Sequence, residues 1–145
     1  MNWKQEAKNE LRVYPNLRAS LGNTAERIAM IDAQMTSIKS ASAGTTPVQG
    51  GGNKNEDRIL DLIVQKERLQ LTRDTNVIRL QLIENGLAAL TETERDIVVT
   101  FAENRSGVAV DLLRNCTGYE QAQIYRIYNE ALYRYTIAEY GIIEF

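Results

Sequence analysis

Apolar and polar residues alternate through the first part of the chain with the period of an α-helix. Between residues 17 and 38, core-type positions are separated by alternating steps of four and three residues, which is the a/d spacing of a coiled-coil heptad. These positions are Leu17, Leu21, Thr24, Ile28, Ile31, Met35 and Ile38. The pattern predicts a long helix with one apolar seam, weakened only at Thr24.

A second long helix is predicted from Glu56 to Leu87, with Asn55 as its N-cap. Its apolar positions are Ile59, Leu62, Ile63, Leu69, Val77, Leu80, Ile83 and Leu87, and they are interrupted by Lys66, Arg73 and Asn76. A helix with one broken stripe is not stable alone in water, so we expect it to pair antiparallel with the first. Residues 40–55 are rich in Gly, Ser, Thr and Asn and have no periodicity, which is typical of a flexible connector.

Residues 1–88 are therefore predicted to form a long antiparallel helical hairpin. The polar residues in its seam indicate that the hairpin is incomplete as a monomer, so we expect a homo-oligomer. Before the seam, Trp3 to Val13 has the composition of a short helix. The Tyr14-Pro15 step is expected to break or kink it, because a proline disfavours helical backbone at the preceding residue.

The C-terminal part, residues 89–145, carries a series of helix start and stop signals. Thr91 and Glu94 have the spacing of a capping box, and a short helix is expected to continue through Ile97, Val98 and Phe101. A further helix is expected from Val108 to about Cys116, followed by a tight turn at Gly118. The last helix has apolar residues at 124, 127, 128, 131 and 132 and is expected to end at Gly141. The order of elements predicts an all-α chain that ends in a helix-turn-helix domain.

The polar residues of the last helix are the candidates for DNA contact. Gln121, Gln123 and Arg126 could reach base edges, since glutamine pairs with adenine and arginine with guanine. Tyr125 could donate to a phosphate or pack on the preceding helix, and both alternatives stay open. Arg105 and Arg114 flank the preceding helix and could hold backbone phosphates. The alternative for the whole set is a solvated helix face without a ligand.

Charge restricts this interpretation. The chain carries 17 basic and 19 acidic residues, a net charge of −2. Residues 90–145 hold five arginines, no lysine and nine acids, so this segment has a net charge of −4. Phosphate neutralisation supplies most non-specific DNA affinity, and an acidic segment therefore binds DNA only if its arginines cluster.

Composition excludes several other classes of protein. The chain has 145 residues, of which 43% are hydrophobic, so we expect either one ordinary domain or a small domain with an extended helical arm. It has no histidine and one cysteine, which argues against a zinc site, a cofactor and catalysis, and no enzyme activity is expected. We expect Cys116 to be buried and inert. No apolar run is long enough for a membrane span or a secretory signal, which favours the cytoplasm. The apolar end (Ile142, Ile143, Phe145) is either a docking tail or a partner contact.

The order of parts also resembles a known group of proteins. The run Leu-Thr-Glu-x-Glu-Arg at residue 90 is followed by Gly-Tyr-x-x-x-Gln-Ile-Tyr-Arg-Ile-x-x-x-Ala-Leu at residue 118. Residues 90–135 resemble the late transcriptional regulators of phages and prophages of the ArpU and RinA type, whose C-terminal part is similar to region 4 of sigma-70 factors. The resemblance implies a phage or prophage transcription regulator in a bacterial cytoplasm that binds double-stranded promoter DNA, with RNA polymerase as a candidate partner.

A protein of another class would share these features. A phage structural or assembly protein, such as a small terminase-like DNA-packaging subunit or a protein-binding adaptor, could also combine a helical hairpin with a helix-turn-helix-like bundle. The acidic C-terminal part favours protein contact, whereas convergence of Arg105, Arg114 and Arg126 on one surface would favour DNA.

Overall fold

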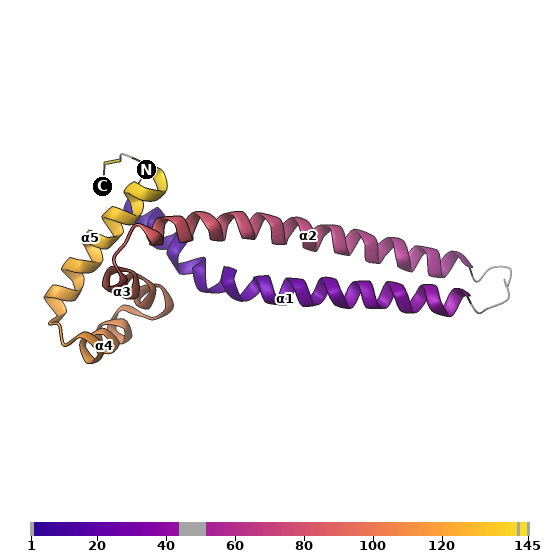
Figure 1. Ribbon diagram of the computed structural model, residues 1–145, viewed down its shortest axis with the longest axis horizontal. Helices are drawn as coiled ribbons and strands as arrows, with labels where there is room; N and C mark the ends of the chain where they lie inside the picture. Colours follow the sequence, from indigo (N-terminus) through magenta and orange to yellow (C-terminus); the bar gives the residue numbers. More distant parts are fainter. Residues whose placement is uncertain (1, 44–51, 142, 145) are drawn as a thin grey trace. The chain divides into compact units, whose positions relative to one another are not determined.

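The computed structural model describes residues 2–43, 52–141, 143 and 144, and within these ranges the chain forms five α-helices and no strand (Figure 1). The helices are α1 (Trp3–Ala43), α2 (Gly52–Ala88), α3 (Glu92–Glu103), α4 (Ser106–Thr117) and α5 (Gln121–Tyr140). The all-α prediction is confirmed. The described part of the chain contains no helix that is both long and apolar enough to cross a membrane.

The chain divides into two compact units. The first, which we call the core unit, combines Met1–Arg18 with Ile78–Phe145, and the second, the arm, is Ala19–Val77. The core unit thus joins the beginning of α1 to the end of α2 and to the three C-terminal helices.

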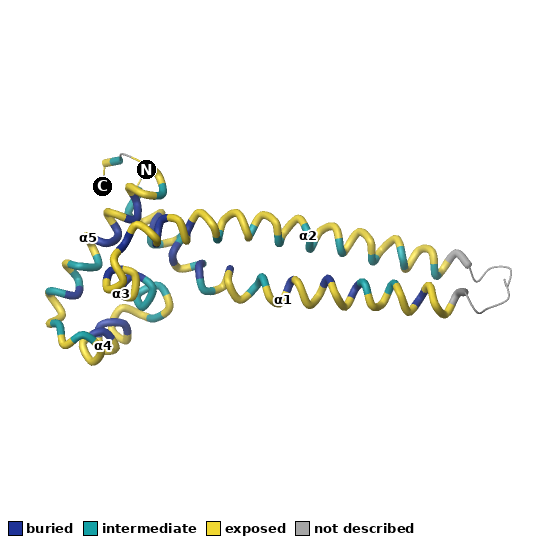
Figure 2. The backbone as a smooth tube through the Cα atoms, viewed as in Figure 1, coloured by how far each residue is buried: buried dark blue, intermediate teal, exposed yellow. Residues whose placement is uncertain are grey.

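In the arm, α1 and α2 run side by side in opposite directions (Figure 1). All seven positions of the predicted seam on α1 are buried or half-buried, while most of the residues between them are exposed (Figure 2). Lys66 of α2 lies opposite α1, and its Nζ is 2.7 Å from Oδ1 of Asp32. The heptad spacing therefore identified the inward face of α1 correctly.

The prediction for α2 needs several corrections. The helix begins at Gly52, three residues before the predicted N-cap Asn55. At the other side of the predicted connector, α1 continues to Ala43. Residues 44–51 of the connector lie outside the described residues. Ile63 and Val77 were predicted to lie on the inner stripe, but their exposed fractions are 38% and 46%. The inner positions continue the strict heptad instead, so Lys66, Arg73 and Asn76 are half-buried members of the seam.

The outer face of α2 carries a second apolar stripe. Leu60, Val64 and Leu71 are 58%, 46% and 69% exposed, and at 3.6 residues per turn they lie within about 40° of one another around the helix. Ile78 and Leu82, further along the same helix, are also exposed. Large apolar side chains gathered on one face are typical of an interaction surface.

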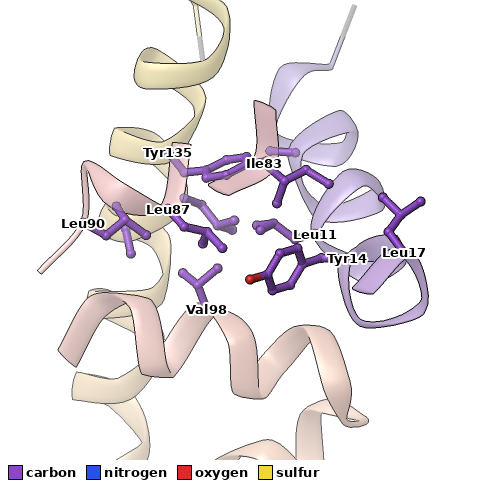
Figure 3. Packing of buried hydrophobic residues seen from close by; sticks show 11 residues of the cluster. Leu11, Tyr14, Leu17, Ile83, Leu87, Leu90, Val98 and Tyr135 are labelled. Carbon is purple, nitrogen blue, oxygen red and sulfur yellow. The ribbon is translucent and has the colours of Figure 1, made fainter. Parts of the chain in front are cut away.

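The core unit is built around one apolar cluster contributed by α1, α2, α3 and α5 (Figure 3). Its buried members are Ala7, Leu11, Tyr14, Leu17, Ile83, Leu87, Leu90, Val98, Ala131, Leu132 and Tyr135. Of the two effects predicted for Pro15, the break is wrong, because α1 stays helical through it, and the kink stays a prediction. A proline inside a helix removes a hydrogen bond and costs about 3 kcal/mol, and burial of Leu11, Tyr14 and Leu17 around it offsets this cost.

Capping interactions fix the ends of the C-terminal helices as predicted. Thr91 and Glu94 form the capping box, with Oγ1 of Thr91 accepting from the Glu94 amide at 3.2 Å and Oε1 of Glu94 accepting from the Thr91 amide at 3.2 Å. Gly118 ends α4 with a φ of 73°, a conformation that glycine adopts without strain, and Gly141 ends α5.

Two predictions for the C-terminal part are wrong in detail. Helix α4 begins at Ser106, two residues before the predicted start, and extends through Thr117. Cys116 is exposed, not buried: it shares the face of α4 that buries Ala109 and Leu113, but it lies in the last turn, next to the end of the helix at Thr117. Ile142 and Phe145 of the apolar end lie outside the described residues, and Ile143 is half-buried.

Candidate nucleic-acid interface

The predicted DNA-contacting residues lie on α4, α5 and the segments before them. Helix α4 is followed by the three-residue turn 118–120, and α5 begins at Gln121. A small second cluster of Ile97, Leu113 and Ile124 packs α3, α4 and α5 together, with Phe101, Tyr119, Ile127 and Tyr128 around it. The turn and this cluster determine which face of α5 is left exposed.

The exposed face of α5 carries two of the predicted residues. Arg126 is exposed and Gln123 is half-buried, and their three-residue spacing places them on adjacent turns of one face. Ile124, on the other side of the helix, is fully buried. Gln123 and Arg126 are therefore placed to contact one ligand together.

Gln121 and Tyr125 occupy a different flank of α5. At 3.6 residues per turn, Gln121 and Arg126 are about 140° apart around the helix. Gln121, Tyr125 and Arg105 line one shallow groove of about 470 Å³ beside the start of α4. The structure thus brings Arg105 to Gln121 and Tyr125, but not to the face that presents Arg126.

Tyr125 has an aromatic neighbour on α3, and its donation to a phosphate stays a prediction. The Tyr125 ring is half-buried, and its centroid lies 5.6 Å from that of Phe101 at an interplanar angle of 46°. Phe101 in turn stacks on Tyr128 with a centroid distance of 4.1 Å and an angle of 24°. Tyr125 therefore packs on α3 while one side of it still lines the groove.

Arg114 lies apart from the other predicted residues. It is exposed in the last turn of α4, where it lines a polar groove with Asp111, Asn115 and Glu120. The two carboxylates reduce the positive potential around its guanidinium. Convergence of Arg105, Arg114 and Arg126 on one surface would favour DNA. The groove linings do not indicate such convergence, since Arg105 and Arg114 border different grooves.

A concave site of the core unit was not anticipated from the sequence. A pocket of about 510 Å³ is lined by residues of α1, α3, α4 and α5. Its lining includes the cations Lys8, Arg12 and Arg105, the carboxylate Glu103, the amides of Asn104 and Asn129, and the rings of Phe101, Tyr125 and Tyr128. We call this the basic pocket. The four-residue spacing of Lys4, Lys8 and Arg12 was a visible signal, but nothing local to α1 indicated which helices it would meet.

The described residues also bear on metal binding. Within them, no group of three or more His, Cys, Asp or Glu side chains is arranged to hold a metal ion. No protein-family model matches this sequence, and no curated protein or solved structure matches it either.

Proposed function

We propose that this chain is a phage or prophage transcription regulator that binds double-stranded promoter DNA through a helix-turn-helix formed by α4 and α5. The observation that carries the proposal is the pair Gln123 and Arg126 on the exposed face of α5, directly after a turn whose glycine has positive φ. In a helix-turn-helix, the second helix enters the major groove and its first turns contact base edges. Gln123 would read adenine and Arg126 guanine. Such a protein acts in the bacterial cytoplasm.

Oligomerisation is part of the proposal. The stripe of Leu60, Val64 and Leu71 on the outer face of α2 fits a second copy of the arm in antiparallel orientation. With Leu71 on the two-fold axis, Arg68 of each copy faces Asp74 of the other, whereas a parallel pair would bring like charges together. A two-fold dimer of this kind matches the symmetry of palindromic operators. RNA polymerase is a candidate second partner for the same complex.

The test is fluorescence-anisotropy binding to labelled duplexes from the chain's own genomic neighbourhood. The double variant Gln123→Ala with Arg126→Ala should lose the preference for its site over unrelated DNA, because each base contact contributes about 1–3 kcal/mol of discrimination. A matched control is Arg27→Ala with Gln34→Ala, which removes the same residue types from an exposed part of α1. If both double variants keep the preference for the site equally well, Gln123 and Arg126 do not contact the DNA bases.

The second candidate function is a phage assembly protein or protein-binding adaptor, with a small terminase-like DNA-packaging subunit as one form. The exposed apolar stripe on α2 favours it, because such a surface also fits a different protein. The two functions differ in the anisotropy measurement. Absence of binding to any duplex at low salt would favour the assembly protein.

A further inference from the structure

The acidic character of the C-terminal helices leaves open where the phosphate-neutralising charge comes from. Residues 90–145 have a net charge of −4, with five arginines against nine acids. In contrast, residues 1–18 contain four cations (Lys4, Lys8, Arg12, Arg18) and two acids. In the core unit the first turns of α1 pack against α5, as the contact of the Trp3 and Tyr140 rings at 4.9 Å illustrates (Figure 1). In the core unit, the cations of the first turns of α1 therefore lie close to the acidic C-terminal helices.

The charges on this part of α1 are segregated. Lys4, Lys8 and Arg12 follow one another in four-residue steps and so share one flank of the helix. Glu6 and Glu10 share the opposite flank and line a separate groove, together with Arg79 and Glu139. The cationic flank is the one that borders the basic pocket.

Three cations from two parts of the chain line that pocket. Lys8 and Arg12 come from α1, and Arg105 precedes the first turn of α4 as its N-cap without a capping hydrogen bond from its side chain. Against them stands the single carboxylate of Glu103. Burial, together with the nearby charges of Lys4 and Arg12, lowers the pKa of Lys8. Cations held close to one another favour a bound anion, because the anion relieves their repulsion.

The pocket lies on the flank of α5 that carries Tyr125, Tyr128 and Asn129. At 3.6 residues per turn, Asn129 is about 60° from the exposed Arg126 around the helix. With α5 in a major groove, as proposed above, this flank would face one of the two phosphate backbones beside the groove. The remaining polar lining, which includes Asn104 and Ser106, supplies the neutral donors that phosphate oxygens also accept.

We propose that Lys8, Arg12 and Arg105 form a clamp for the DNA phosphate backbone, so that the first turns of α1 supply the sequence-independent affinity that the C-terminal helices lack. This inference rests on the proposed DNA-binding function. Two surfaces then contact different parts of the DNA: the α5 face around Arg126 contacts the bases, and the basic pocket contacts the phosphate backbone.

The salt dependence of DNA binding tests the clamp. The logarithm of the affinity falls linearly with the logarithm of the salt concentration, with a slope of about 0.9 per phosphate neutralised. Lys8→Gln with Arg12→Gln should lower the magnitude of this slope by about two and weaken binding to the specific site and to unrelated DNA by the same factor. The matched control is Lys54→Gln with Arg58→Gln, the same residue types at the same spacing on an exposed part of α2, and its slope should not change.

Three readouts keep the test decisive. Circular dichroism and the fluorescence of Trp3, the only tryptophan, show whether the α1 variant is folded, and Arg105→Gln should lower the slope by about one without altering α1. Unchanged slopes in the folded variants, with wild-type binding intact, would overturn the clamp and leave the DNA-binding function standing. Failure of the wild-type chain to bind any duplex would overturn both.

Discussion

Gly86 of α2 lies directly against the ring of Tyr135 on α5. A β-carbon placed on Gly86 would be 2.6 Å from Cε2 and 2.9 Å from Cδ2 of that ring, closer than carbon atoms approach one another. Tyr135 is fully buried in the core cluster, so its ring has no room to withdraw (Figure 3). The absence of a side chain at residue 86 is what allows α2 and α5 to pack this closely.

Gly86→Ala is therefore expected to destabilise the core unit by about 1–3 kcal/mol, the usual cost of overpacking. The measurement is urea unfolding followed by Trp3 fluorescence. Gly22→Ala is the matched control, since it lies inside a helix with no atom within 4 Å of the added carbon. It should stabilise by about 0.5–1 kcal/mol, because alanine favours the helix over glycine. If Gly86→Ala is as well tolerated as Gly22→Ala, the close approach of the two helices is wrong.

Local signals in the sequence predicted the elements of this fold better than their long-range packing. The heptad at Leu17 to Ile38, the Thr91–Glu94 capping box and the ends of helices at Gly118 and Gly141 depend on residues within a few positions of one another, and all of them are found. In α2, by contrast, the apolar residues Ile63 and Val77 were assigned to the seam although the heptad places Lys66 and Arg73 there. Two apolar stripes on one helix cannot be separated by hydrophobicity alone.

The candidate site shows the same limit. The types of residue on α5 indicated DNA contact, but the division of Gln121 and Tyr125 from Arg126 follows from which face Ile124 buries. The cations of α1 reach the basic pocket only because Ala7, Leu11 and Tyr14 pack on residues more than 70 positions away. Contacts of that separation leave no periodic pattern in a single sequence.

Glu94 links the start of α3 to α5. Its Oε1 accepts from the Thr91 amide and, at 2.7 Å, from Nη1 of Arg134, and its side chain is only 7% exposed. Glu94→Ala should cost about 0.5–2 kcal/mol of unfolding free energy, because it removes the Glu94 half of the capping box and the ion pair with the half-exposed Arg134. Glu92→Ala, two residues earlier at an exposed position of the same turn, is the control and should change stability by less than about 0.5 kcal/mol. Similar losses in the two variants would show that Glu94 acts only through the helix dipole.

Stability should fall as the pH rises, because of Glu139. Burial, followed by the hydrogen bond and charge of Glu10, raises the pKa of Glu139 from 4.5 to about 8. Between these values the folded chain holds a proton that the unfolded chain has released, so the stabilisation is complete below about pH 4.5 and is lost as the pH rises through 8. Glu139→Gln keeps a neutral group at this position and should flatten the decline in urea midpoint between pH 5.5 and 8.5. Glu130→Gln, exposed on the same helix, should keep the wild-type decline. If the decline in urea midpoint is the same in Glu139→Gln as in the wild type, other titrating groups cause it.

The outer stripe of α2 makes a prediction about assembly. Leu71 is 69% exposed in the single chain and would lie on the two-fold axis of the proposed antiparallel dimer. Leu71→Glu should therefore convert the protein to a monomer in sedimentation velocity, because it removes about 1.5–3 kcal/mol of apolar burial per chain and sets two carboxylates against each other. Helicity should be unchanged, and Thr72→Glu, an exposed neighbour off the stripe, should leave the dimer intact.

The antiparallel register can be tested separately through its charges. Arg68→Asp would place a carboxylate opposite Asp74 of the second copy. The substitution should weaken the dimer, since like charges then face each other at two symmetric places in the interface. Arg68→Asp combined with Asp74→Arg restores opposite charges across the axis and should recover the dissociation constant to near its wild-type value. A parallel dimer would show neither the loss nor the recovery, because residues 68 and 74 would face their own counterparts and meet a like charge in the wild type and in both variants. Loss in the single variant followed by recovery in the double variant would therefore establish both the orientation and the centre at Leu71, and a wild-type chain that stays monomeric would exclude the interface altogether.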